Sequence, residues 1–460
     1  MLINSKSALL ISIKRITQTN KGKKTAGIDG YKALTEKERV NLYKKMQGCH
    51  IKKHNPRPSV RTYIKKKNGK LRPLSIPTIK DRIYQNIAKM ALEPQREARF
   101  EPTSYGFRPK RGCHDAIERI FLSCAPGKKK WIFEGDFKGC FDNLRHDHIM
   151  EQIKDFPYHS VIERWLKAGC IDNHVFSRTE KGSGQGAVIS PLLANIALHG
   201  MEEQLGIKYE ELTDARGYEC VHNKTKYAMV RYADDFAFMC EHKEDADAVY
   251  ERLKPYLEKR GLELEPSKTR VVSIEEGFDF LGFNIRRYKT DQGGKLLIKP
   301  SKETVSKSMK QISEKVHKSY GQNVGEVINM LNPVITGKAN YWRPMVAKET
   351  FSKMDNHIFI IMRRFLTRMH PQKPLGWIKK QYYKTDSTGK SKRQWILTDP
   401  VSKSQLKIMT QTKIIRHVMI KHKATPYNPE LKEYFEKRDK KYNSNNPRQD
   451  GEKVCLSCMS

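Results

Sequence analysis

The sequence has no apolar run long enough to cross a membrane. A membrane-spanning helix needs roughly 20 consecutive apolar residues, and no stretch of the 460 residues approaches that length. The first 16 residues mix Ser, Lys and Leu without the continuous apolar core of a secretory signal. We therefore expect an intracellular protein without a membrane partner.

Closely spaced cysteines are nearly absent, and acidic residues are far fewer than basic ones. The nine cysteines are scattered singly apart from Cys455 and Cys458, which excludes a disulfide framework and is typical of a reducing compartment. Lys and Arg number 88 against 51 Asp and Glu, so the formal net charge is +37. This excess predicts a polyanionic partner, and nucleic acid fits it better than a membrane surface.

Two adjacent carboxylates, Asp234 and Asp235, stand between short apolar runs at residues 227–233 and 236–240. Aromatic-rich runs of this length predict buried strands, with the two Asp residues at the turn of a hairpin. Neighbouring negative charges at a turn indicate a divalent metal. A solvated turn between two core strands is the alternative.

A third carboxylate, Asp136, ends an apolar strand pattern at residues 131–136. Taken alone, it fits a helix cap or a metal ligand equally well. Three Asp residues on neighbouring strands can hold two Mg²⁺ ions about 3.5–4 Å apart, and such a pair activates a 3′-hydroxyl for nucleotidyl transfer. The three carboxylates together therefore predict a nucleotidyltransferase.

Residues 60–77 predict a second hairpin, because Asn68-Gly69 separates two alternating segments. Its cations are Arg61, Lys65, Lys66, Lys67, Lys70 and Arg72. A basic ribbon can clamp a phosphate chain, although lysines also protect edge strands from unwanted pairing. Residues 81–92 then predict a helix that ends before Pro94.

A glycine-rich loop at residues 181–189 leads into a further helix. Ser190 is a good N-cap and Pro191 suits the first helical position. The apolar stripe that follows predicts one helix that ends at Gly206.

From about residue 296 helical patterns replace strand patterns. We expect helices at residues 302–318, 323–331 and 350–369. Residues 373–440 interleave cations with aromatic residues, which suits single or distorted nucleic-acid strands, although the same aromatic residues could be ordinary core. The last segment, 441–460, is polar and predicted to be disordered.

The order of these motifs resembles the reverse transcriptase and maturase proteins encoded by group II introns. The resemblance covers nearly the whole chain, and seven blocks in order make it specific. The blocks are residues 61–77, Ser104-Tyr-Gly-Phe-Arg-Pro109, Glu134-Gly-Asp136 with Phe141-Asp142, Gly184-Gln-Gly186 with Ile189-Ser-Pro-Leu-Leu-Ala-Asn195, Tyr232-Ala-Asp-Asp235, Gly261-Leu with Lys268-Thr269, and Phe280-Leu-Gly-Phe283.

The resemblance implies a role for each matching residue. Asp136, Asp234 and Asp235 would be the catalytic metal ligands, helped by the backbone carbonyl of Phe137. The implied nucleotide contacts are Arg61, Lys66, Arg72, Phe141, Gln185 and Gly186. Phe141 would exclude a ribose 2′-hydroxyl, with core packing as its alternative role. The implied nucleic-acid contacts are Lys65, Lys67, Lys70, Arg108, Lys268, Arg363 and Arg364.

The implied fold is α+β, a right-hand polymerase followed by an α-helical thumb and a basic C-terminal segment. Its expected parts are fingers at 1–115, a palm at 116–295, a thumb or maturase domain X at 296–372, a DNA-binding segment at 373–440 and a disordered tail at 441–460. Leu331-Asn-Pro333 and Asn340-Tyr-Trp342 carry the resemblance to domain X.

The implied function is RNA-directed DNA polymerisation with two Mg²⁺ ions, on dNTPs, a template RNA and a DNA primer or target. The resemblance also implies binding of group II intron RNA for splicing, and intron mobility, in a bacterial cytoplasm rather than an organelle. A catalytically idle maturase that only binds RNA is the main alternative. A reverse transcriptase recruited to host defence, or domesticated without an intron, is another.

Two departures from the family accompany the resemblance. The segment before Gly27-Ile-Asp-Gly30 is shorter than usual, and only a remnant of the C-terminal HNH endonuclease is present. Cys455 and Cys458 supply two of the four ligands that a closed zinc site requires, so we expect neither zinc nor endonuclease activity. The sequence leaves open a truncated or split frame, a separate endonuclease polypeptide, and a homodimer.

Overall fold

The computed structural model describes residues 2–65, 69, 71–213, 219–291, 293–387, 389 and 395–445. The chain forms two compact units. The first comprises residues 1–123, 128–271 and 420–431, and the second comprises 124–127, 272–419 and 432–460. No helix within the described ranges is long and apolar enough to cross a membrane.

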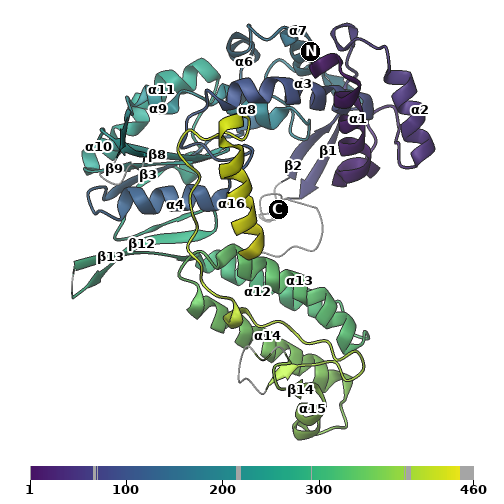
Figure 1. Ribbon diagram of the computed structural model, residues 1–460, viewed down its shortest axis with the longest axis vertical. Coiled ribbons are helices and arrows are strands. Elements are labelled where there is room, and N and C mark those ends of the chain that lie inside the picture. Colours follow the sequence, from purple (N-terminus) through teal and green to yellow (C-terminus); the bar gives the residue numbers. More distant parts are fainter. Residues whose placement is uncertain are drawn as a thin grey trace. The chain divides into compact units, whose positions relative to one another are not determined.

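A four-stranded sheet with the order β10-β3-β9-β8 forms the centre of the first unit (Figure 1). Its strands are β3 (Trp131–Asp136), β8 (Tyr227–Tyr232), β9 (Asp235–Cys240) and β10 (Arg270–Ser273). Phe133, Phe236 and Phe238 belong to the main core of the unit. Ile132 and Ala237 alternate with them and are buried on the opposite face. Because both faces are covered, the strands read as continuous apolar runs.

Helices lie on both sides of this central sheet (Figure 1). On one side is α4 (Cys113–Cys124), and on the other are α10 (Lys243–Asp247) and α11 (Val249–Arg260). Leu253 and Tyr256 of α11 join the same core as Phe236. Helix α11 ends at Arg260, and Gly261 follows as a C-cap in the left-handed conformation.

A second sheet in the first unit has the order β2-β1-β4-β5. Its strands are β1 (Ser59–Lys65), β2 (Leu71–Ile76), β4 (Cys170–Asp172) and β5 (Val175–Ser177). β1 and β2 form the antiparallel hairpin predicted from Asn68-Gly69, and β1 also pairs in parallel with β4. We call β1 and β2 the basic hairpin.

The other elements of the first unit are mostly helical. They are η1 (Leu2–Asn4), α1 (Lys6–Lys14), η2 (Arg15–Thr19), η3 (Lys21–Lys24), α2 (Glu36–Met46), η4 (Ile51–Lys53), α3 (Ile79–Glu97), α5 (Cys140–Asn143), α6 (His146–Gln152), α7 (His159–Lys167), α8 (Ser190–Ala197), α9 (Met201–Gln204), β6 (Tyr209–Thr213), β7 (Glu219–Asn223), η5 (Pro266–Lys268) and η7 (Pro429–Leu431).

The predicted limits of two helices in the first unit are wrong. Helix α3 continues through Pro94 to Glu97, because burial of Ile83, Ile87 and Leu92 outweighs the one hydrogen bond that a proline removes. Helix α8 has Ile189 rather than Ser190 at its N-cap. The Ser190 hydroxyl instead donates to the backbone carbonyl of Ser183. The helix also stops at Ala197, and α9 is a separate turn.

The second unit combines an antiparallel sheet with long helices. Its sheet is β11 (Phe278–Phe280), β12 (Phe283–Thr290) and β13 (Gly293–Pro300). Its other elements are α12 (Lys302–His317), α13 (Val324–Trp342), α14 (Lys348–Met369), α15 (Leu375–Tyr382), β14 (Tyr383–Lys384), β15 (Ile396–Leu397), η6 (Met409–Gln411) and α16 (Lys432–Asn445). Helix α13 is longer than the predicted 323–331. Residues 441–445 of the predicted disordered tail are helical.

The segment 420–431 packs into the first unit although the chain on either side of it belongs to the second. The buried guanidinium of Arg111 donates to the carbonyls of His422 and Ala424, at 2.9 and 3.1 Å. The Asp115 carboxylate accepts from the N–H of Ile420 at 2.8 Å. We call residues 420–431 the return segment.

Candidate active site

The hairpin of β8 and β9 brings Asp234 and Asp235 to the edge of the central sheet beside Asp136. Asp235 pairs in register with Asp136 across β9 and β3, and with Tyr232 across the hairpin. The turn requires Ala233 to adopt a left-handed conformation with φ of 59°, which is uncommon for a residue with a Cβ atom. The structure therefore brings together the three carboxylates that the sequence singled out.

The segment Ser104–Gly106 supports the turn from its other side. Ser104 forms a parallel bridge with Arg231, and the N–H of Tyr105 donates to the Arg231 carbonyl at 2.9 Å. A Cβ atom on Gly106 would lie 2.3 Å from the backbone nitrogen of Ala233. Only glycine allows this close approach, which explains the Tyr-Gly-Phe motif.

A buried cation beneath the turn has no role in the sequence-based prediction. Arg231 is fully buried and donates to the carbonyl of Ala233 at 3.3 Å and to the amide oxygen of Asn195 at 3.2 Å. Asn195 in turn donates to the carbonyl of Gly106 at 2.9 Å. Arg231 thus links α8, the turn and the Ser104–Gly106 segment. A charged residue inside an apolar strand is the signal that could have revealed it.

Lys268 is paired with the carboxylate of Asp136. The sequence predicted Lys268 as a nucleic-acid contact, whereas in this structure its ammonium group neutralises a proposed metal ligand. The hydrogen bond to Asp136 is the main reason that the pKa of Lys268 is raised.

The backbone next to Asp136 is held by the segment before Lys268. Phe137 forms an antiparallel bridge with Leu264, flanked by bonds from Lys138 N–H to Glu263 O (2.9 Å) and from Glu265 N–H to Asp136 O (2.8 Å). In this type of pair, the two residues direct their own N–H and C=O groups away from each other. The carbonyl of Phe137 therefore points away from residues 263–265.

The two Asp residues of the turn are hard to ionise together. Removal from bulk water and then the charge of Asp136 raise the pKa of Asp234. The pKa of Asp235 is raised to about 7, first by desolvation and then by the charges of Asp234 and Asp136. Asp235 keeps access to solvent, but the surrounding protein still restricts its hydration. Such crowding favours any arrangement that adds positive charge.

The donor atoms match Mg²⁺ in type, because carboxylate and backbone carbonyl oxygens are hard ligands. The mutual repulsion of the three carboxylates matches it in charge. Across the described ranges, no three His, Cys, Asp or Glu side chains converge as a set that could hold one ion. Asp136 is bound to Lys268 instead. The residues thus have the donor atoms and the charge that Mg²⁺ requires. One proposed ligand, Asp136, is paired with the ammonium group of Lys268 in this structure.

On the other side of this site, the basic hairpin meets the glycine-rich loop. The Arg72 guanidinium donates to the Gln185 side-chain oxygen at 2.8 Å, and the N–H of Ser75 donates to the Gln185 carbonyl at 2.6 Å. Gly186 adopts φ of 111°, and a Cβ atom there would lie 2.9 Å from the Ser75 carbonyl oxygen. Three residues predicted to contact the nucleotide, Arg72, Gln185 and Gly186, are therefore adjacent.

Phe141 lies in α5, between β3 and the glycine-rich loop. Its carbonyl accepts from the N–H of Ser183 at 2.8 Å, and its ring meets Phe107 edge to face at 6.1 Å between centroids. The residue is 8 % exposed. Both its predicted role against a 2′-hydroxyl and its alternative role in packing stay open.

The remaining predicted contacts have different outcomes. Arg108 is wrong as a nucleic-acid contact, because its guanidinium is buried, bonds Glu97 at 2.7–3.1 Å and donates to two backbone carbonyls. Lys65 is exposed, as are Arg363 and Arg364 in the second unit. Arg61 donates to the Cys170 sulfur at 3.7 Å. Three further predicted contacts, Lys66, Lys67 and Lys70, lie outside the described residues.

Three known families match successive parts of the chain. The family described as reverse transcriptase (RNA-dependent DNA polymerase) matches residues 64–285. The group II intron maturase-specific domain matches residues 305–383, and the N-terminal domain of reverse transcriptase matches residues 1–46. Protein YkfC of Escherichia coli is 33 % identical over 311 residues, which cover 62 % of this chain and 82 % of YkfC.

The chain belongs to the group II intron-encoded reverse transcriptase and maturase family.

Two other relatives in this family differ more in length. The group II intron-encoded protein LtrA of Lactococcus lactis is 33 % identical over 323 residues, which cover 58 % of this chain and 53 % of LtrA. The chain thus spans about half the length of LtrA. Maturase-like protein 1 of Euglena gracilis is 26 % identical over 354 residues, covering 74 % of this chain and 69 % of that protein.

Among solved structures, a telomerase from Candida albicans matches with a TM-score of 0.40 and 14 % identity, covering 71 % of this chain and 65 % of that one. Membership of the family fits the α+β fold observed here, a reverse transcriptase domain followed by a helical maturase domain.

Proposed function

We propose that this member of the family is an active RNA-directed DNA polymerase. The observation that carries the proposal is the register of β3 and β9, which sets Asp136 opposite Asp235 with Asp234 next to it at the turn. When bound, two Mg²⁺ ions would activate the 3′-hydroxyl of the primer and neutralise the departing pyrophosphate. Asp136, Asp234, Asp235 and the carbonyl of Phe137 are the proposed ligands.

The other side chains bind and orient the substrates. Arg72, held by Gln185, supplies a planar cation for the triphosphate of a dNTP. Gly186 allows close approach of backbone to the nucleotide, and Phe141 is proposed to exclude a 2′-hydroxyl. Lys268 neutralises Asp136 until metal binds. Lys66, proposed as a second triphosphate contact, lies outside the described residues.

The chain is further proposed to bind its intron RNA as a splicing maturase and to support intron mobility. The match of residues 305–383 to the maturase-specific domain supports this. In the proposed division, residues 1–115 are fingers, 116–295 palm, 296–372 thumb and 373–440 a DNA-binding segment. Exposed Arg363 and Arg364 on α14 are the proposed RNA contacts there. Relatives in two bacteria support a bacterial setting.

The test is extension of a DNA primer on an RNA template by the purified chain with Mg²⁺ and dNTPs. Asp234→Ala should reduce the extension rate at least a thousandfold, about 4 kcal/mol of transition-state stabilisation, because a proposed metal ligand is lost. Asp247→Ala, an exposed carboxylate at the end of α10, is the control and should leave the rate unchanged.

The outcome that would replace this proposal is tight binding of intron RNA without any primer extension by the unmodified chain. The family's maturase domain would then act alone, as an RNA-binding splicing factor.

A further inference from the structure

A buried carboxylate, Glu101, lies near the turn that carries Asp234 and Asp235, and it has no role in the mechanism proposed above. The residue is 6 % exposed. Its Oε1 atom accepts from the N–H groups of Gly200 at 3.0 Å and Glu202 at 2.7 Å. Its Oε2 atom is buried and has no hydrogen-bond partner among the described residues. Because a buried charge is costly unless it is paired, the surroundings of Oε2 indicate what Glu101 does.

The Oε2 atom of Glu101 faces Arg231. It lies 4.0 Å from a terminal nitrogen of the guanidinium, which is too long for a hydrogen bond but close for two opposite charges shielded from water. The other terminal nitrogen of Arg231 donates to the Ala233 carbonyl at 3.3 Å and to the Asn195 side chain at 3.2 Å. In the described part of the chain, Glu101 is the one carboxylate that pairs with Arg231. Glu101 therefore balances the cation that holds the turn.

The backbone around Glu101 is fixed against the strand that contains Arg231. The Arg231 N–H donates to the Thr103 carbonyl at 3.0 Å, and the Tyr105 N–H donates to the Arg231 carbonyl at 2.9 Å. The Glu101 carbonyl accepts from the Arg108 guanidinium at 2.6 Å. Glu101 cannot move away from Arg231 unless these bonds break, so it is a fixed anchor for the guanidinium.

A second buried carboxylate, Glu202, has different partners. It accepts from the hydroxyls of Thr103 and Tyr209. Burial, and then the charge of Glu101, raise the pKa of Glu202 to about 7. Burial also raises the pKa of Glu101, and the charge of Arg231 is the main effect that opposes this rise. Near neutral pH we therefore assign the negative charge to Glu101, which faces the guanidinium, and a proton to Glu202.

We propose that Glu101 is a positioning residue for nucleotidyl transfer: its carboxylate orients Arg231, and Arg231 in turn orients the turn that carries Asp234 and Asp235. The inference rests on the proposed function, because it requires this turn to hold the reacting groups. Without the charge of Glu101, the guanidinium can rotate toward other acceptors. The Ala233 carbonyl then loses its donor, and the two Asp residues shift relative to β3.

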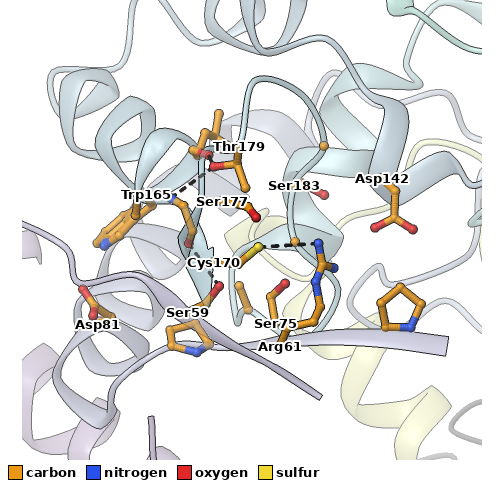
Figure 2. A pocket seen from close by; sticks show the side chains of 18 of the residues that line it. Ser59, Arg61, Ser75, Asp81, Asp142, Trp165, Cys170, Ser177, Thr179 and Ser183 are labelled. Atoms are coloured by element: carbon orange, nitrogen blue, oxygen red, sulfur yellow. Dashed lines mark hydrogen bonds between the residues drawn. The ribbon is translucent and has the colours of Figure 1, made fainter. Parts of the chain in front are cut away.

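The proposed dNTP contacts are held by other elements. Arg72 donates to Gln185, and the N–H of Ser75 donates to the Gln185 carbonyl. Ser75 also lines a cavity of about 360 Å³ between the basic hairpin and the β4–β5 hairpin (Figure 2). Neither Glu101 nor Arg231 lines this cavity. A change at Glu101 should therefore displace the turn and leave the binding of a dNTP unchanged.

The first experiment measures kcat and the KM for dNTP of the full chain in primer extension. In Glu101→Gln the amide oxygen can still accept from the two N–H groups, but the charge is lost. We expect kcat to fall at least about tenfold, because the turn is displaced, with KM unchanged. Glu202→Gln is the matched control. Because Gln resembles the protonated form of Glu202, both constants should stay as in the parent. Equal loss of kcat in both variants, or a change in KM alone, overturns the proposal.

Magnesium binding provides a readout that does not depend on catalysis. The Tm of each protein is measured against Mg²⁺ concentration without nucleic acid, because a ligand that binds the folded state raises the Tm. We expect Glu101→Gln to require about tenfold more Mg²⁺ than the parent for the same rise, and Glu202→Gln to match the parent. An identical Mg²⁺ dependence of Glu101→Gln and the parent overturns the proposal. If the parent does not extend primers but this difference is present, the polymerase function alone is contradicted.

A double variant separates positioning from folding. Glu101→Gln combined with Arg231→Gln removes both buried charges, so it should have a higher Tm than Glu101→Gln alone, which leaves a buried cation without its partner. It therefore remains testable where the single variant fails to fold. Because Glu101 acts through Arg231, the kcat of the double variant should equal that of Arg231→Gln alone. Recovery of kcat together with the Tm, or losses of kcat that multiply, overturns the proposal.

Discussion

At the residue scale, the proposed metal site combines negative charges that repel each other with supports that prevent the turn from relaxing. Asp235 faces Asp136 across the sheet, and both Asp234 and Asp235 have raised pKa values. Buried Arg231 and the close approach of Gly106 hold the turn from behind. The turn therefore holds its carboxylates where a cation could neutralise them. When no cation is bound, their repulsion lowers the stability of the folded protein.

This cost predicts the pH dependence of stability. The folded-state pKa of Asp235 is raised to about 7, whereas an unfolded Asp titrates near 3.9. Between these values the folded protein binds more protons, so the free energy of unfolding falls as pH rises and stays lower above pH 7. In metal-free buffer, Asp235→Asn should therefore be more stable than the parent at pH 8 and nearly equal to it at pH 4.

Urea denaturation with a chelator at the two pH values measures the difference. Asp147 is the matched comparison, because its hydrogen bond from Arg145 lowers its pKa to about 2. Asp147→Asn should be slightly less stable than the parent at pH 8, the opposite sign. Equal stability of parent and Asp235→Asn at pH 8 would contradict the strained-turn interpretation.

A second prediction concerns Gly106. In Gly106→Ala the new methyl group would lie 2.3 Å from the nitrogen of Ala233, so the turn must shift at a cost of about 1–3 kcal/mol. We expect lower stability and loss of primer extension. Gly337→Ala in α13 has no atom within 4 Å of the new group and should be neutral or stabilising by up to ~1 kcal/mol. Thermal denaturation and primer extension on both variants provide the comparison.

Sequence reasoning singled out the three Asp residues and Gln185 because local motifs mark them, and the structure places the three Asp residues at one edge of the central sheet. It misjudged Arg108, whose motif position could not reveal that Glu97 lies beside it in space. It also gave no role to Arg231, although that residue is within the same apolar stretch as the two Asp residues. Both errors concern buried arginines, whose partners come from distant parts of the chain.

At the scale of elements, the return segment is the feature that the sequence did not predict. Besides its bonds with Arg111 and Asp115, the segment makes two further hydrogen bonds to the first unit. Lys423 donates to the Glu211 carboxylate at 2.7 Å, and the Tyr427 hydroxyl donates to the Glu93 carboxylate at 2.7 Å. A basic, aromatic composition predicted nucleic-acid contact for these residues, and the structure places residues 420–431 against the first unit instead.

Truncation tests the contribution of the return segment. A chain that ends at residue 431 keeps both hydrogen bonds of Arg111 to the segment, whereas one that ends at 419 loses them. Hydrogen bonds from a charged group contribute roughly 1.5–3 kcal/mol each. The free energy of unfolding measured in urea should therefore be at least ~3 kcal/mol lower for the shorter chain than for the longer one. Equal stability of the two chains would show that the segment contributes nothing to the first unit.

Predictions of elements succeeded where a local rule determines the outcome. Asn68-Gly69 specified the basic hairpin, and the short apolar runs on either side of Asp234-Asp235 specified β8 and β9. The predictions of helix ends failed at Pro94 and Pro333. Both helices continue past the proline, because buried side chains on both sides compensate for its missing N–H. These predictions also failed at Ser190, whose hydroxyl bonds Ser183 rather than its own helix. Tertiary contacts decided each of these cases.

At the scale of the whole molecule, the order of motifs predicted the family and fold class, because many weak signals in one order are specific. The division into two compact units was harder to predict from the sequence. Contacts place the boundary between Val271 and Val272 and assign residues 420–431 to the first unit. The composition of the sequence changes only near residue 296. Composition reports local propensity, and units are defined by contacts between distant segments.

The net charge of +37 supports the last prediction. If Lys and Arg side chains neutralise many RNA phosphates, counterion release makes affinity for intron RNA fall steeply with salt, by roughly 10³-fold or more between 50 and 200 mM. Arg363→Ala and Arg364→Ala on the exposed side of α14 should each lower the slope of log affinity against log salt by about 1. Asp234→Ala should leave the slope unchanged, because it affects catalysis rather than the phosphate contacts. Filter binding across a salt series measures all three, and an affinity that is flat over this range would contradict an electrostatic RNA interface.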